Sequence, residues 1–428
     1  MSFQDFQKAP NRLTQREIGF LIVAVFVVIL VLYLLAITNN YLANLWPDGG
    51  EFALLRTGGS SFLFDHVEPY SGNVPALVQE QVYARPAESG EDLYILDIPF
   101  YLLIFYFPLA LFPETLMARA FWLALSEIAL AGFLYFSFRL LDRPIPNIFI
   151  GLLAIAGVSS YYAYRSLLEG SPVILLGLVY VGILVSLRAN RDEFAGALMA
   201  FSAFQWEIGG LFLVFVTLWV FWEKRWRVFA GGGMLALIML MISFMWYPSW
   251  IMPFLRASWN SFRVGFGFST HDFLEQLWPQ FGDIAGWVLT AILIVALGYE
   301  WLAARRAHFN HFFWAACLTL AATPLLGHHV ELDHLFPLTM PIMVVILISR
   351  ERWKKLGDGI AFLILWFFFG LSWLLYIQGV PDWIGLSKDE ILSLFWPAFT
   401  VIGLYWVRWW LVRPPRTWLD SATYMDRK

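Results

Sequence analysis

The segment Trp46–Phe52 combines two carboxylates, Asp48 and Glu51, with the pair of glycines that lies between them. A carboxylate held against a hydroxyl group can act as a general base. Glycine has no side chain, so another group can approach its backbone closely. The segment is therefore either a general-base site or an ordinary solvated loop with helix-capping acids.

A second polar segment, 327–334, lies far along the chain and contains three histidines and two acids, flanked by apolar runs. Ionisable side chains within membrane segments are costly and usually functional. We expect His328, His329 and Asp333 to bind substrate or handle protons, with helix-end capping as the alternative. Histidine and carboxylate also bind metals, but this spacing matches no metalloenzyme signature, so no metal site is predicted.

Arginines are scarce between the basic loops, and Arg85 and Arg165 are the two that we consider for catalysis. A guanidinium can hold a departing phosphate by two parallel hydrogen bonds. Arginines at a membrane interface also serve simply as anchors, and that alternative stays open for both residues.

The composition of the 428-residue chain is that of an integral membrane protein: 60% of the residues are hydrophobic, 14% are charged, and the mean hydropathy is +0.65. Soluble domains have about 45–50% apolar and about 25% charged residues. The composition therefore excludes an ordinary soluble protein. We predict an all-α polytopic fold that forms a single transmembrane domain over residues 1–428.

Apolar runs of the length needed to cross a bilayer, about 20 residues, recur along the sequence. The candidate helices lie near 18–37, 97–112, 115–138, 147–163, 171–187, 194–204, 205–222, 228–247, 285–303, 311–325, 335–349, 358–377 and 391–412. If both termini lie on one side, one candidate does not cross. Either 97–138 crosses once with a break at Pro113, or 194–222 is one helix. We expect about 12 crossings.

Positive charge collects in short loops, chiefly 223–227 and 350–355. Cytoplasmic loops carry an excess of Lys and Arg, so both termini are predicted to be cytoplasmic. The first outer loop, 38–96, and the second outer loop, 248–284, then face the opposite side. Prolines divide the first loop into pieces too short to cross, and its apolar residues predict short amphipathic helices that lie on the membrane and cover a cavity.

The glycine triplet Gly231–Gly233 predicts close helix packing rather than a nucleotide cradle, since no strand or phosphate-binding lysine accompanies it. No other segment suggests a nucleotide-sugar domain. A sugar-transferring function would therefore need a lipid-linked donor.

The first outer loop resembles that of glycosyltransferase family 87, whose members have the GT-C membrane fold and include phosphatidylinositol mannoside mannosyltransferases. The residues that carry the resemblance are Pro47–Phe52, Gly58, Pro69–Ser71, Gln79, Tyr83–Ala87 and Gly90–Glu91. Weaker matches follow in order as far as about residue 350. Glu51 falls on the family's catalytic aspartate, with Asp48 as the alternative base.

The resemblance also implies which side chains bind substrate. They are Tyr70, Gln79, Tyr83, Arg85, Arg165, Gln205, Glu207, His328, His329 and Asp333. Gln205 stands where the family has a lysine, which moves the expected phosphate contact to an arginine such as Arg85 or Arg165.

The implied activity is transfer of a hexose, with mannose expected, from a polyprenyl-phosphate donor to a lipid or glycan acceptor, with inversion and on the non-cytoplasmic face. The expected location is a bacterial cytoplasmic membrane, with membrane lipids and no nucleic acid as partners. No metal is required, although a divalent cation stays open. The alternatives are a polymerase or ligase of lipid-linked glycans and a lipid or solute transporter. Polar residues such as Gln205 and Glu207 on discontinuous helices would suit transport, whereas the lack of internal repeats counts against it.

Overall fold

The protein is helical throughout the part of the chain that the computed structural model describes, and no strand occurs there. The described residues are 26, 30, 33–45, 49–88, 91–141, 145–202, 206–264, 270–326, 330–379 and 387–412. A helix satisfies its backbone hydrogen bonds internally, as a lipid environment demands.

The first half of the chain forms twelve labelled elements, and residues 33–45 before them are also helical. They are α2 (Gly50–Phe64), α3 (Asn73–Tyr83), α4 (Phe100–Leu103), η2 (Ile104–Tyr106), α5 (Phe107–Ala110), α6 (Thr115–Leu141), α7 (Asn147–Val158), α8 (Tyr161–Glu169), α9 (Val173–Arg188), α10 (Asp192–Phe201), α11 (Trp206–Trp222) and α12 (Trp226–Trp246).

The second half continues with two amphipathic helices and a further set of long apolar ones. They are α13 (Ile251–Val264), α14 (Thr270–Leu277), α15 (Gly282–Ala303), α16 (Phe309–Ala322), η3 (Thr323–Leu326), η4 (Asp333–Leu338), α17 (Thr339–Arg352), α18 (Lys354–Leu365), the π-helical turn η5 (Trp366–Gly370), α19 (Leu371–Gln378) and α20 (Lys388–Val412).

Seven helices among the described residues are long and apolar enough to cross a membrane, and α7 with α8 makes an eighth if this pair, bent by 43°, is one span. The seven are α6, α12, α15, α16–η3, η4–α17, α18–α19 and α20. Shorter apolar helices occupy Phe100–Ala110, Val173–Arg188 and Glu207–Trp222. These helices support an integral membrane protein.

Most predicted helices correspond to observed ones where the described residues cover them, but the predicted helix 147–163 is divided into α7 and α8, which are bent by 43° to each other. The break predicted at Pro113 is present, because α5 ends at Ala110 and α6 begins at Thr115. The alternative, one helix over 194–222, stays untested because residues 203–205 lie outside the described residues. The first predicted helix, 18–37, lies mostly outside them as well.

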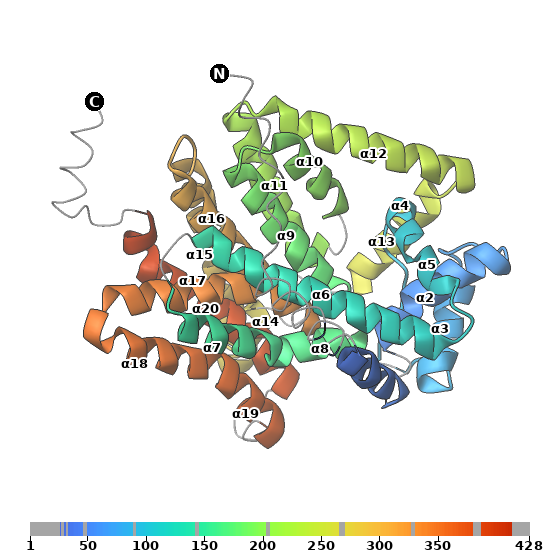
Figure 1. Cartoon of the computed structure of the whole chain (residues 1–428), viewed down its shortest axis with the longest axis horizontal. Coiled ribbons are helices and arrows are strands. Elements are labelled where there is room, and N and C mark those ends of the chain that lie inside the picture. Colours follow the sequence, from blue (N-terminus) through green and yellow to red (C-terminus); the bar gives the residue numbers. More distant parts are fainter. Residues whose placement is uncertain are drawn as a thin grey trace, which may run out of the picture.

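The helix over residues 33–45 extends into the range predicted as the first outer loop, whose described residues after it contain α2 of 15 residues and α3 of 11 residues. Neither belongs to the helices long enough to cross a membrane, which confirms the prediction that residues 50–90 hold no full crossing. They gather with α4, α5 and α13 at one end of the molecule, away from α16, α17 and α18 (Figure 1). The second outer loop contains α13 and α14.

The basic loops between the long helices contact one another. Arg188 at the end of α9 donates a hydrogen bond to Leu140 O at the end of α6 (2.7 Å), and Arg225 before α12 donates to Leu187 O (2.9 Å). The guanidinium of Arg188 also lies over the ring of Phe309, which begins α16. We call this meeting of helix ends the basic end, and we include in it Glu300 near the end of α15 with its partners His311 and Arg408.

The glycine triplet packs α12 against α10. A Cβ atom added to Gly231 would overlap the backbone of Glu193, and one added to Gly196 would overlap that of Val228. Small residues let helix backbones approach closely, so the predicted role of the triplet in helix packing is confirmed.

Candidate functional site

The carboxylate of Glu51 lies beside the imidazole of His334, which joins the first outer loop to the second polar segment. Glu51 Oε1 is 3.6 Å from His334 Nε2, and that nitrogen is 3.7 Å from Asp333 Oδ2. Asp333 is 2% exposed and His334 is 7% exposed. The two polar segments therefore meet at Glu51 and His334.

Four further carboxylates interact electrostatically with these residues: Asp97, Glu169, Glu207 and Glu331. We call the six carboxylates together with His334 the acid cluster. Its members come from α2, the segment before α4, α8, α11 and the segment 330–334, so the fold concentrates negative charge at one place.

Burial alters the acidity of two carboxyls in this cluster. It raises the pKa of Asp97, and a 2.7 Å hydrogen bond from Ser261 Oγ opposes that rise by stabilising the carboxylate. Burial, reinforced by the charge of Asp333, raises the pKa of Glu331 well above its usual range. Carboxyls of raised pKa are typical of sites that exchange protons.

Helix geometry stabilises part of this charge. Glu51 lies in the first turn of α2, and Glu207 lies in the first turn of α11. The N-terminus of a helix carries a partial positive charge, which favours a carboxylate there.

The backbone of Asp333 is held by α8, since Ser166 Oγ donates a 2.7 Å hydrogen bond to Asp333 O.

Arg119, which is 1% exposed in α6, anchors the end of α8 beside the cluster. Its guanidinium donates to Leu167 O at 2.9 Å and also to Leu168 O. Trp122, one turn later, donates a 2.7 Å hydrogen bond to Gly170 O. These bonds satisfy carbonyls that a helix end leaves without partners.

The glycines before Glu51 admit protein rather than substrate. A Cβ atom on Gly49 would lie 2.6 Å from Leu168 O, and one on Gly50 would lie 2.5 Å from the ring of Tyr94. Gly49 therefore lets the start of α2 pack closely against the end of α8, and Gly50 lets it pack against Tyr94. This packing brings Glu51 to His334.

Arg165 is the predicted phosphate-binding residue that lies nearest to the acid cluster. It projects from α8, where its NH2 is 3.2 Å from Glu169 Oε1, and it also interacts electrostatically with Asp333. About a third of its side chain is exposed. Arg165 can therefore still bind an anion.

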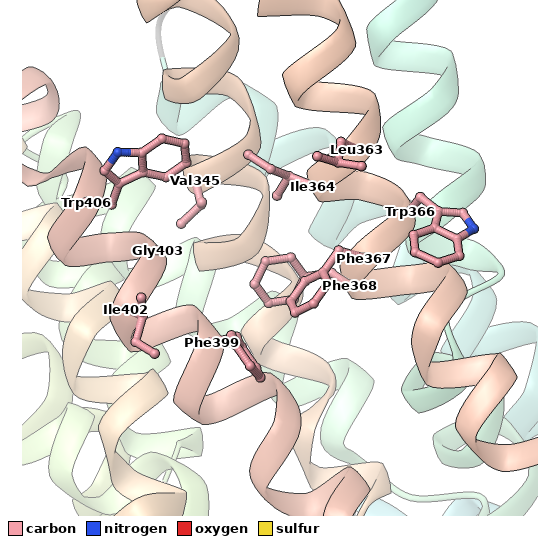
Figure 2. A pocket seen from close by; sticks show the side chains of 10 residues that line it. All are labelled: Val345, Leu363, Ile364, Trp366, Phe367, Phe368, Phe399, Ile402, Gly403 and Trp406. Atoms are coloured by element: carbon pink, nitrogen blue, oxygen red, sulfur yellow. The ribbon is translucent and has the colours of Figure 1, made fainter. Parts of the chain in front are cut away.

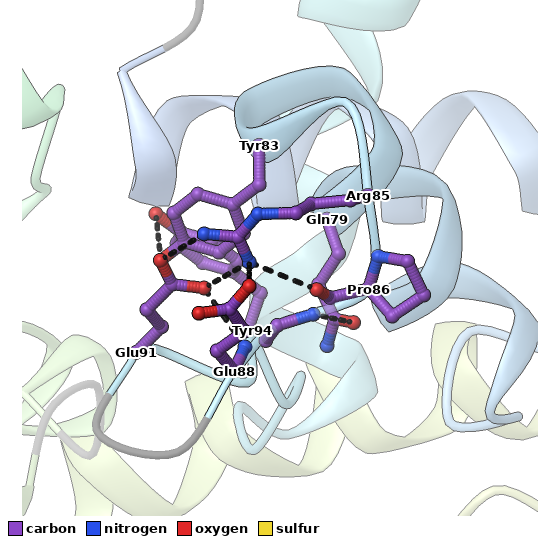
Figure 3. A network of polar contacts seen from close by, with 8 residues as sticks. Gln79, Tyr83, Arg85, Pro86, Glu88, Glu91 and Tyr94 are labelled. Atoms are coloured by element: carbon purple, nitrogen blue, oxygen red, sulfur yellow. Dashed lines mark hydrogen bonds and ion pairs between the residues drawn. The ribbon is translucent and has the colours of Figure 1, made fainter.

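Arg85 is engaged elsewhere. Both of its terminal nitrogens bond to Glu91 at 2.7 Å in an exposed loop (Figure 3). The bidentate guanidinium lowers the pKa of the Glu91 carboxyl to about 2. The geometry of this pair organises the end of the first outer loop.

The other predicted residues of this loop also hold it together. Gln79 donates to Leu93 O at 3.0 Å and accepts from Ala87 N at 3.1 Å. The rings of Tyr83 and Tyr94 are 5.7 Å apart, and Figure 3 shows them beside the arginine. Because Tyr94 also packs on Gly50, this network supports the start of α2 and thereby the position of Glu51.

Tyr70 fastens the loop between α2 and α3, since its hydroxyl donates a 2.8 Å hydrogen bond to Ile98 O. Burial raises the pKa of this phenol, so it stays protonated and remains a donor. The residue before Ile98, Asp97, belongs to the acid cluster. Tyr70 therefore stabilises the segment that positions Asp97.

Four predicted site residues lie outside the described residues: Asp48, Gln205, His328 and His329. Sequence reasoning did not assign individual roles to His334, Asp97, Glu169 or Arg119. His334 could have been found as the histidine adjoining Asp333. Arg119 carried a usable signal as a lone arginine in the apolar run of α6, because such a charge requires a partner.

An apolar cavity of about 350 Å³ lies between α17, η5 and α20 (Figure 2). Its lining residues are Val345, Leu363, Ile364, Trp366, Phe367, Phe368, Phe399, Ile402, Gly403 and Trp406. The π-helical turn widens the local backbone, and its Phe368 O accepts hydrogen bonds from Ser372 and Trp396. The cavity can accommodate hydrocarbon.

Models of known protein families give no match to this chain, and the curated proteins compared with it give none either. Function therefore has to be inferred from the geometry and chemistry of the cluster itself.

Proposed function

We propose that the protein is a membrane glycosyltransferase that moves a hexose, mannose in the first instance, from a polyprenyl-phosphate donor to a lipid or glycan acceptor. The observation that carries the proposal is the placement of Glu51 beside His334 within the acid cluster. The resemblance of the first outer loop to glycosyltransferase family 87 supports it, since that family's catalytic acid falls on Glu51.

The proposed reaction is a single displacement with inversion at the anomeric carbon. The acceptor hydroxyl loses its proton to Glu51 and its oxygen forms the new bond to that carbon. The bond between this carbon and the phosphate oxygen breaks, and its electron pair leaves with the polyprenyl phosphate. His334 holds the carboxylate of Glu51 in place through their contact, and general-base assistance contributes roughly 10²–10⁴ in rate.

Arg165 is the proposed phosphate-binding residue. It lies on α8 beside Asp333, whereas Arg85 is paired with Glu91. A guanidinium strengthens its hydrogen bonds as charge develops on the leaving phosphate. The phosphate would thus be held on the side of the cluster formed by α8.

The proposed architecture is a GT-C fold with about 12 crossings and with both termini on the cytoplasmic side. This number counts the seven long helices and the α7–α8 pair, the shorter helices α9, α10 and α11, and the predicted first helix. In this topology the basic end is cytoplasmic and the acid cluster lies on the other face, at a bacterial cytoplasmic membrane.

The donor's lipid tail requires an apolar path. The cavity between α17, η5 and α20 supports this requirement. Val345 lies 12 residues after Asp333 along one span, or roughly 18 Å at helical rise. A polyprenyl chain can extend over that distance.

The test is transfer from polyprenyl-phosphate mannose to a lipid acceptor by purified protein in nanodiscs. Glu51→Gln keeps the size of the side chain but cannot accept the proton, so turnover should fall roughly 10²–10⁴-fold. Glu80→Gln is the matched control, because it is the same substitution at an exposed position of the same loop. It should leave turnover unchanged.

Asp48→Asn separates the two candidate bases. A dead Asp48→Asn variant beside a fully active Glu51→Gln variant would move the base to Asp48. Full activity in both variants would remove this loop from the chemistry. A wild-type protein that translocates solute or lipid without cleaving any polyprenyl-phosphate sugar would instead be a transporter.

A further inference from the structure

We propose that Glu51, Asp333 and His334 form a binding site for a divalent first-row transition-metal cation, such as Mn²⁺ or Zn²⁺. The three residues come from two segments far apart in the sequence, and each offers one ligand atom. These atoms all lie within 4.8 Å of one another. The donor set is one imidazole nitrogen and two carboxylate oxygens.

The distances between these atoms suit a shared cation. Metal–ligand bonds of about 2.0–2.2 Å place neighbouring ligands on a tetrahedral or octahedral ion about 3.0–3.6 Å apart. Glu51 Oε1 and His334 Nε2 are 3.6 Å apart, and His334 Nε2 and Asp333 Oδ2 are 3.7 Å apart. Both distances are close to that range, and the Glu51 and Asp333 oxygens lie within 4.8 Å of each other, so a cation would draw these side chains closer together.

The environment of Asp333 is an independent indication of a ligand. Its side chain is 3% exposed, and its Oδ2 accepts no hydrogen bond from the described residues. A buried carboxylate oxygen without a donor is costly. Because this oxygen is directed towards His334, a cation between the two would compensate that cost.

The balance of charge around the three residues also favours a cation. Asp97, Glu207 and Glu331 add carboxylates that interact with Glu51 and with His334. Among the described residues that interact with Asp333, Arg165 and His334 are the cationic ones. A divalent ion would offset the repulsion among these acids.

The ligand types select the class of metal. Imidazole suits zinc and other transition ions, while carboxylates also suit manganese; calcium and magnesium prefer oxygen ligands alone. Three protein ligands leave coordination positions open. If the proposed function holds, a phosphate oxygen of the donor would fill one of them, and the other oxygen of Glu51 would still accept a proton.

The experiment is a titration of the purified full-length protein in nanodiscs with Mn²⁺ alone, without sugar donor, followed by electron paramagnetic resonance. We expect one tightly bound Mn²⁺ per chain whose pulsed spectrum shows coupling to an imidazole nitrogen. Zn²⁺ should displace it, and Ca²⁺ in equal amount should not. A wild-type protein that binds no Mn²⁺, or binds it without nitrogen coupling, overturns the proposal.

Variants locate the site. His334→Gln should abolish the nitrogen coupling, and Asp333→Asn should weaken Mn²⁺ binding at least 10-fold. His271→Gln is the matched control, since His271 belongs to a more exposed group with Asp272 and Glu275 and should change neither quantity. Loss of the coupling in His271→Gln but not in His334→Gln overturns the proposal. Sugar transfer is measured separately, so metal binding and the proposed function can fail independently.

Discussion

The buried carboxylate at the basic end is paired with cationic side chains, whereas in the acid cluster the carboxylates outnumber their cationic partners. At the basic end, Glu300 is 3% exposed, and its carboxylate contacts both His311 Nε2 (3.2 Å) and Arg408 NH2 (2.9 Å). In the acid cluster, several carboxylates converge on His334 and Arg165. A buried ion is tolerated only with a partner. The excess of acids in the cluster therefore does not stabilise the fold, and we attribute it to function.

The same contrast extends to the arginines. Arg188 and Arg225 at the basic end bond to backbone carbonyls of neighbouring helices. Arg165 makes one contact with a partly exposed carboxylate, Glu169, and keeps an exposed face. Arg188 and Arg225 are thus bound within the fold, while Arg165 retains an exposed face that a ligand can reach. Variants at the two ends should therefore separate catalysis from stability.

After Glu51→Gln, the largest effect is expected at Arg165. If its guanidinium holds the leaving phosphate, Arg165→Gln should lower turnover roughly 10²–10³-fold, the usual loss when one charge-stabilising donor is removed. Arg85→Gln is the matched control and should cost less than about threefold, because Arg85 is bound to Glu91 outside the acid cluster. Steady-state transfer from polyprenyl-phosphate mannose measures both. Equal losses in the two variants would remove this distinction between them.

A smaller effect is expected at the basic end, and on stability. Glu300→Gln leaves His311 and Arg408 without their carboxylate. Breaking a buried pair costs about 3–5 kcal/mol; because Arg408 is partly exposed, we expect about 2–3 kcal/mol. Thermal unfolding in nanodiscs, followed by tryptophan fluorescence, measures the loss. The remaining folded protein should transfer sugar at the wild-type rate, and a specific loss of turnover would contradict the assignment of this end to structure.

A smaller effect on stability is expected at the glycine triplet, where two of the glycines can be compared with each other. Gly231→Ala places a methyl group against the backbone of Glu193 and should destabilise the protein by about 1–3 kcal/mol. Gly233→Ala meets nothing within 4 Å and should be neutral or slightly stabilising, since alanine favours helix. Thermal unfolding of the two variants side by side tests this. Similar stabilities would show that α10 and α12 are not closely packed there.

Much of the fold followed from apolar run lengths and turn residues. The ranges 115–138, 228–247 and 285–303 lie within or within a few residues of α6, α12 and α15. Run length alone could not decide which short apolar helix crosses, because α9 and α11 are shorter than a bilayer requires.

The site was accessible to sequence reasoning only in part. Glu51 and Asp333 were predicted because acids stood out in an apolar chain. The contributions of Asp97 and Arg119 depend on where α4 and α6 lie relative to α8, which a linear pattern does not contain. Arg85 was predicted to bind phosphate because of its charge, but it forms an ion pair with Glu91, six residues later in the sequence.

The smallest expected effect is the change in stability of Glu51→Gln. The substitution removes the contact with His334 and, at the same time, a negative charge that interacts with Asp97, Glu207 and Asp333. His334 keeps Asp333 as a partner at 3.7 Å. The attraction lost and the repulsion relieved should nearly cancel, so the free energy of unfolding should stay within about 1 kcal/mol of the wild-type value or rise, as is usual when a strained functional group is neutralised. Thermal unfolding without metal or donor measures this. A loss as large as that of Glu300→Gln would mean that Glu51 is a structural ion-pair partner like Glu300, and the distinction between the two ends would fail.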